Sequence, residues 1–257
     1  MHFTTAEITA WVGSLLWPFL RIGAMLVAAP LFGAGMVTVR VRLAFAFLLA
    51  LVVAPLIPVP PAVEPLSLAG LVISAQQILI GLTIGFVLQM VFSAMSQAGE
   101  TIALSMGLGF ASMVDPQQGV QVPVVSTYFV IMSTLIFLAL NGHVALIELT
   151  LMSFHSMPIA VDGIVRADLW ALVSWGSTMF VFGLLVALPA VASMLLVNLS
   201  MGVITRAAPQ LNIFAVGFPM MILLGFVLLL LTLPVLVPQF TELLAQAFGL
   251  IGQITGR

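Results

Sequence analysis

The side chains that could do chemistry in this chain are few, and their spacing forms no catalytic or metal-binding group. His143 and Glu148 are five residues apart, which differs from the i, i+4 spacing of a zinc-binding helix, and no HExxH sequence is present. Gly107-Leu108-Gly109 matches half of a dinucleotide-binding fingerprint, but the third glycine is missing. The sequence also offers no convincing nucleophile–base pair, carboxylate pair or phosphate loop. We therefore expect no enzymatic activity, no metal site and no cofactor.

A stripe of polar side chains interrupts one long apolar segment. Its members recur at offsets of four, seven, eight and eleven residues, which places them on one face of a helix: Gln89, Ser93, Ser96, Gln97 and Glu100. A carboxylate on an apolar helix is costly unless it is paired or hydrated, and such acids often mark pathways. A structural hydrogen bond and a pathway-lining role both fit Glu100.

The stripe leads into a glycine-rich stretch, GETIALSMGLGFASMVDPQQG (residues 99–119). Glycines without a Cβ and a proline without an N–H end regular helix geometry there. Non-helical backbone at membrane depth is tolerated only where it is buried in protein or lines a water-filled cavity. The stretch is therefore interpreted as a lining or a stopper. Four methionines nearby suit a seal that must yield, although gap-filling in a helical core explains each equally well: Met90, Met95, Met106 and Met113.

The composition indicates which kind of secondary structure must position these residues. The 257-residue chain is 63% hydrophobic and 5% charged, with a mean hydropathy of +1.32, whereas soluble proteins have roughly 25% charged residues. We expect an all-α integral membrane protein. The net charge of −2 and the absence of lysine exclude a basic surface for nucleic acid. The first apolar segment lacks a basic n-region and is expected to remain in the mature chain.

Apolar periodicity predicts about six long hydrophobic helices. The predicted segments are 5–29, a short run over 43–56, 66–106, 123–140, 169–201 and 213–237. The third segment is nearly forty residues long, whereas about 20 residues cross a bilayer, so its far end must leave the membrane or enter a protein-lined interior. Gly81 and Gly85 form a small-xxx-small face for close helix packing, and Gly99, Ala103 and Gly107 form another.

Other features of the chain give narrower expectations. Arg21 lies among apolar residues, where snorkelling, a carboxylate partner or contact with another subunit could each satisfy it. Asn141-Gly142 is predicted to be a turn, and residues 152–168 a polar connection. Pro189 should kink the fifth helix. Residues 206–212 should join the last two helices as a hairpin, and residues 242–257 should form a short amphipathic tail.

Four motifs in order resemble one family over nearly the whole chain. They are MGLGFASMVDPQQG (106–119), FLALNGH (137–143), SFHSMPI (153–159) and RAAPQLNIFAVGFP (206–219). Together they are similar to the FliR family of the bacterial type III flagellar export apparatus. Thr38 departs from the family pattern, which tends to have a proline there.

This resemblance implies a subunit of an export gate, with one copy assembled with several FliP-like and FliQ-like chains. Residues 1–164 would be FliP-like, with a plug loop at 106–119, and residues 165–257 would be a FliQ-like hairpin. The assembly would lie in the bacterial inner membrane at the flagellar basal body, in contact with lipid and with FlhB-like and FlhA-like proteins. Unfolded flagellar proteins would pass through it.

The resemblance also assigns roles to individual residues. The plug or gate would be formed by Met106, Gly107, Gly109, Phe110, Met113, Asp115 and Pro116. The hairpin turn, as a subunit contact, would be formed by Arg206, Pro209, Gln210 and Asn212. The alternative is a stand-alone multi-pass transporter, for which paired broken helices are expected, and the sequence has one such break.

Overall fold

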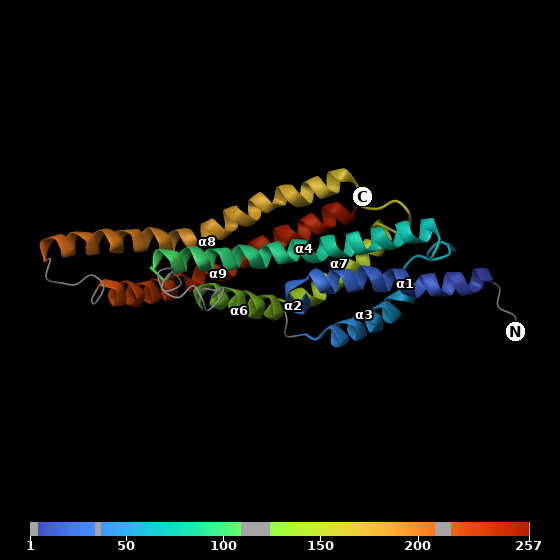
Figure 1. Ribbon diagram of the computed structural model, residues 1–257, viewed down its shortest axis with the longest axis horizontal. Coiled ribbons are helices and arrows are strands. Elements are labelled where there is room, and N and C mark those ends of the chain that lie inside the picture. Colours follow the sequence, from blue (N-terminus) through green and yellow to red (C-terminus); the bar gives the residue numbers. More distant parts are fainter. Residues whose placement is uncertain (1–4, 34–36, 109–123, 209–216, 257) are drawn as a thin grey trace. The chain divides into compact units, whose positions relative to one another are not determined.

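The computed structural model describes residues 5–33, 37–108, 124–208 and 217–256 (Figure 1). Every regular element in these ranges is a helix, and the elements in chain order are α1 (Thr5–Ala28), α2 (Pro30–Gly33), α3 (Val39–Val53), the 3-10 helix η1 (Ala54–Leu56), α4 (Leu68–Ser105), α6 (Val124–Ala139), α7 (Gly142–Ser156), α8 (Arg166–Ala207) and α9 (Phe218–Thr255). Five stretches are long and apolar enough to cross a membrane: Trp11–Ala28, Val39–Leu56, α4, α8 and Pro219–Thr255. The pair α6 and α7, bent by 67°, would count as a sixth span. The prediction of an all-α integral membrane protein is confirmed.

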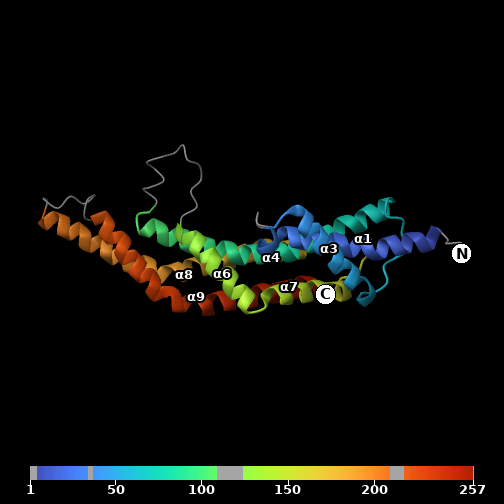
Figure 2. The same cartoon turned by 90° about the horizontal axis from the view of Figure 1, so that it is seen from below.

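The chain divides into two compact units. The first comprises Met1–Met90, Phe137–Gly176 and Leu244–Arg257. In it, α1 packs on α3 and on the N-terminal part of α4, and the views agree on this neighbourhood (Figures 1 and 2). Glycines allow the close approach of α1 to α4, because a Cβ at Gly85 would lie 2.6 Å from the Met25 carbonyl oxygen, and one at Gly81 would collide with the Arg21 carbonyl oxygen.

The second unit comprises Val91–Ile136 and Ser177–Leu243. The C-terminal part of α4 is its central helix and meets three others. A Cβ at Gly99 would lie 2.6 Å from the Cα of Ser126 in α6, and one at Gly183 in α8 would lie 3.0 Å from the Ala94 carbonyl oxygen. Phe92 packs edge-on against Phe240 of α9, with ring centroids 5.9 Å apart. Glycine placement therefore sets the closest packing in both units.

Several helix boundaries differ from those that the sequence predicted. The turn at Asn141 is present, with φ at 55°, but a further helix, α7, follows it where none was expected. Helix α9 continues through Pro234 and Pro238 to Thr255 and includes the predicted separate tail. Prolines are tolerated in long membrane helices because neighbouring groups satisfy the freed carbonyls. Helix α8 contains Pro189 as predicted, but it runs from Arg166 to Ala207, beyond both predicted ends, and α3 begins at Val39, so it includes Arg40 and Arg42.

The packing of α1 on α4 gives a test with a matched control. Gly81→Ala should lower the free energy of unfolding by roughly 1–3 kcal/mol, because the new methyl group forces α1 away from α4. Gly176→Ala, where nothing lies within 4 Å of the new Cβ, should raise it by up to about 1 kcal/mol through helix propensity. Thermal unfolding of the two detergent-purified variants measures the difference, and equal midpoints would contradict the packing.

Candidate functional site

The polar stripe lies on the less buried face of α4. Gln89 and Glu100 are exposed, and Ser93, Ser96 and Gln97 are half-buried, while the residues between them are mostly buried. The helical face that the spacing predicted is therefore present. The exposed residues of this face are available for contact with water, with another subunit or with the contents of a passage.

Part of the stripe makes contacts within the chain. The Ser96 and Ser126 hydroxyl oxygens lie 2.8 Å apart, and the Ser126 hydroxyl is also 3.0 Å from the Ser96 carbonyl oxygen, so α4 and α6 are joined by paired serines. Gln97 lies beside Gly183 of α8, where a Cβ would be 3.4 Å from its Oε1 atom. The open part of the stripe therefore consists of Gln89, Ser93 and Glu100. Spacing alone could not distinguish the stripe residues that contact α6 and α8 from those that stay open, because it does not show where these two helices lie.

Helix α4 ends in a Schellman motif. The Leu108 N–H donates to the Ala103 carbonyl at 3.0 Å, and the Gly107 N–H donates to the Leu104 carbonyl at 3.0 Å. Gly107 has φ at 80°, the left-handed conformation that this motif requires and that glycine adopts without a Cβ penalty. Gly107 therefore stops the helix just beyond the polar stripe, within the glycine-rich stretch.

Met106 fixes this helix end to α9. Its side chain is fully buried and covers Gly225, where a Cβ would lie 2.6 Å from the methionine Cε and Cγ atoms and 3.0 Å from the sulfur. The flexible thioether fits the notch that the missing side chain leaves. The first two residues of the predicted plug are thus held by packing and by backbone hydrogen bonds.

The other predicted plug and hairpin residues lie mostly outside the described part of the chain. These are Gly109, Phe110, Met113, Asp115, Pro116, Pro209, Gln210 and Asn212. Arg206 is described, and it is exposed in the last turn of α8, where a cation interacts favourably with the helix dipole. The roles of all these residues stay predictions.

The most elaborate polar site is one that the sequence only partly indicated. Arg21 of α1 is fully buried, and its Nε and Nη2 atoms donate to Gln77 Oε1 of α4 at 2.9 and 2.6 Å. Nη1 donates to the Ser153 carbonyl at 2.8 Å and to its hydroxyl at 3.0 Å, and Nη2 also donates to the Met157 carbonyl at 2.8 Å. The guanidinium carbon lies 4.1 Å from the centroid of the Phe154 ring. Arg21 thereby joins α1, α4 and the end of α7.

The expected partners of Arg21 were wrong. No carboxylate in the described ranges pairs with it, and its burial within the chain excludes both snorkelling and contact with another subunit. Ser153 lies in the last turn of α7 and Met157 is its C-cap residue, so both carbonyls stand at the negative end of the α7 dipole. That end of the helix supplies the negative potential that a carboxylate would otherwise give.

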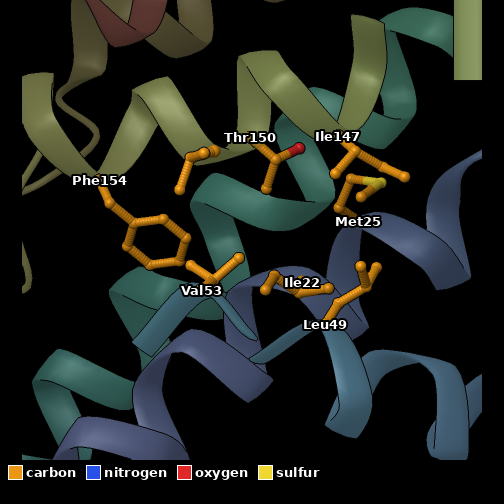
Figure 3. A pocket seen from close by; sticks show the side chains of 8 residues that line it. Ile22, Met25, Leu49, Val53, Ile147, Thr150 and Phe154 are labelled. Atoms are coloured by element: carbon orange, nitrogen blue, oxygen red, sulfur yellow. The ribbon is translucent and has the colours of Figure 1, made fainter. Parts of the chain in front are cut away.

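The packing beside this site leaves no room for a ligand. Figure 3 shows seven side chains that line a small pocket beside it: Ile22, Met25, Leu49, Val53, Ile147, Thr150 and Phe154. The pocket has a volume of about 10 Å³, which is near the size of one water molecule. Only Thr150 among these carries a polar side-chain atom, and its hydroxyl donates to the Leu146 carbonyl at 2.8 Å. Over the residues that the structure describes, no three His, Asp or Glu side chains gather to hold a metal. The hydrogen bonds of Arg21 therefore position three helices relative to one another.

Comparison with known proteins gives a consistent match over the full length. The model of the family described as "Bacterial export proteins, family 1" matches residues 12–247. The chain is similar to the flagellar biosynthetic protein FliR of Pectobacterium carotovorum subsp. carotovorum, with 38% identity over 254 residues, 99% of this chain and 97% of the relative. It is 36% identical to FliR of Escherichia coli K12 over the same shares of both chains, and 33% identical to FliR of Bacillus subtilis 168 over 87% of each.

The buried arginine gives a prediction about stability. Arg21→Lys should lower the free energy of unfolding by roughly 2–4 kcal/mol, because one ammonium cannot reproduce the planar set of charge-assisted hydrogen bonds to two other segments. Arg40→Lys, at an exposed position, should change it by less than about 0.5 kcal/mol. Thermal unfolding in detergent measures both variants, and a wild-type midpoint for Arg21→Lys would show that the hydrogen-bond geometry is unimportant.

Proposed function

The chain belongs to the bacterial export proteins, family 1, and on this premise we propose that it is one subunit of a flagellar export gate. A role in flagellar export and the presence of several membrane-spanning segments follow from the family and the apolar helices. The proposal adds the assembly: one copy of this chain joins several FliP-like and FliQ-like chains in the inner membrane and contacts FlhB-like and FlhA-like proteins. The observation that carries it is the family match along nearly the whole chain.

Helix length supports an assembly with other proteins. At 1.5 Å per residue, the 42 residues of α8 span about 63 Å and the 38 residues of α9 about 57 Å, whereas the hydrocarbon core of a bilayer is about 30 Å thick. Only 33% of the most apolar window of α8 and 17% of that of α9 is buried in this chain. Exposed apolar residues extend along α8 from Leu169 to Ile204. Lipid can cover about half of such a helix, so other subunits must cover the rest.

The open polar residues of α4 support a passage beside this helix. Gln89 and Glu100 remain exposed on a helix whose opposite face is buried, and a lipid-facing position would be costly for the carboxylate. A water-filled passage for unfolded chains would hydrate both groups. In the proposed gate, residues 106–119 close this passage, beginning at the fixed end of α4.

A substitution at the helix end tests the proposed closure. Gly107→Trp should make the inner membrane leakier to small solutes or lower secretion of flagellar proteins severalfold, with little change in the amount of the chain. Gly107→Asn is the matched control, because asparagine tolerates the left-handed conformation and adds less bulk. Solute uptake, secreted flagellar protein and immunoblots of membranes give the three readouts. Normal tightness together with normal secretion in Gly107→Trp would remove the gate assignment of this residue.

Co-expression tests the assembly itself. The chain should be more homogeneous and unfold at a higher temperature when it is purified with the FliP-like and FliQ-like proteins of its own genome than when it is purified alone, because its exposed apolar faces need those partners. Native mass spectrometry of the intact complex should give a mass that contains one copy of this chain. A stable monomer or homodimer that is indifferent to those proteins would favour a stand-alone transporter instead.

A further inference from the structure

An apolar groove of about 320 Å³ lies among α1, α3 and α4 in the first unit. Apolar side chains from all three helices form its walls: Phe19, Val27, Leu43, Ala46, Ile78 and Leu82. Gly23 opens it, since a Cβ there would meet only the Ala46 methyl group, at 3.9 Å. The groove is thus a narrow hydrophobic slot on a membrane-spanning part of the chain.

One charged side chain, Arg42, lines this groove. Its Nε atom is buried without a hydrogen-bond partner among the described atoms, and Nη2 reaches the Val37 carbonyl only at 3.3 Å. Arg40, two residues earlier, is exposed. Within the described ranges no carboxylate pairs with either arginine. The Arg42 guanidinium is therefore a cationic donor with an unused N–H group, and it lies where α3 borders the groove.

The position of the arginines on α3 favours an anion at this end of the groove. Both lie in the first turn of α3, which contains no acidic residue, and the N-cap residue Thr38 makes no side-chain capping bond. A helix N-terminus carries partial positive charge and free N–H groups, so two nearby cations are unfavourable there and an anion is favourable. A single bound phosphate would satisfy the helix end and Arg42 together.

We propose that this groove binds one glycerophospholipid, with its phosphate at Arg42 and the start of α3 and one acyl chain in the apolar slot. A charged end joined to a narrow apolar run matches the chemistry of a phospholipid, and basic pockets between membrane helices are known to hold lipid headgroups. An apolar helix of a neighbouring protein would cover the apolar walls but would leave the arginine donor and the helix end without an anion. The lipid would be bound independently of the proposed gate.

A photoreactive lipid tests the site. The full chain, alone and in complex with its FliP-like and FliQ-like partners, is reconstituted with phosphatidylglycerol that carries a diazirine in one acyl chain, irradiated, and mapped by peptide mass spectrometry. Arg42→Gln removes the phosphate contact and Gly23→Leu fills the slot. The matched controls are Arg40→Gln, at the exposed arginine, and Gly176→Leu, at a helical glycine with open space. Circular dichroism checks that each variant is folded.

We expect cross-links concentrated on residues 19–27 and 39–46, lowered severalfold in both Arg42→Gln and Gly23→Leu and retained in both controls. The pattern should persist in the complex. Three results would each overturn the site: wild-type labelling in Arg42→Gln and Gly23→Leu, labelling spread equally over α8 and α9 as for lipid surrounding any membrane protein, or loss of labelling when the partners are present, which would show that a protein occupies the groove.

Discussion

The first unit depends on one buried cation. The Arg21 guanidinium uses all of its N–H groups on neutral acceptors from α4 and α7, so the three helices can be satisfied in only one relative arrangement. A buried charge left without such partners would cost several kcal/mol, and this penalty opposes any sliding of one helix along another. The α7 C-terminus acts as the counter-charge, which explains how Arg21 is buried without a carboxylate partner among the described residues.

A second constraint is the length of the long helices, which limits how much of their apolar surface lipid and the chain itself can cover. Helices α4, α8 and α9 are each about twice as long as a bilayer is thick, yet their most apolar windows differ in burial, at 67%, 33% and 17%. Helix α4 is thus the core of the chain, and α8 and α9 expose apolar faces that lipid can cover only in part. This difference places the chain's internal contacts on α4 and leaves α8 and α9 for contacts with other molecules.

The sequence predicted the features that depend on local chemistry. Apolar runs located the spans, the small-xxx-small pattern identified Gly81 and Gly85 as a face for close helix packing, and Gly107 was expected to end α4; that α1 is the packing partner came from the structure. It missed α7, because the polar residues around Asn141 and His155 resemble a connection, and it ended α9 too early because residues 242–257 were interpreted as a separate amphipathic tail. The partners of Arg21 lie 56, 132 and 136 positions away and are neutral, so neither spacing nor charge could identify them.

The fixed end of α4 limits how the proposed gate can open. The Schellman hydrogen bonds hold the backbone as far as Leu108, and Met106 is packed into the notch at Gly225 of α9. An opening that leaves these contacts intact must take place beyond Leu108. An opening that includes Met106 must separate it from α9, and the exposed apolar faces of α9 are where other subunits would act on that helix. Under the second route, a displacement of α9 by its neighbours would release the start of residues 106–119. Opening of the proposed gate would then be coupled to the packing of the subunits through the contact of Met106 with Gly225.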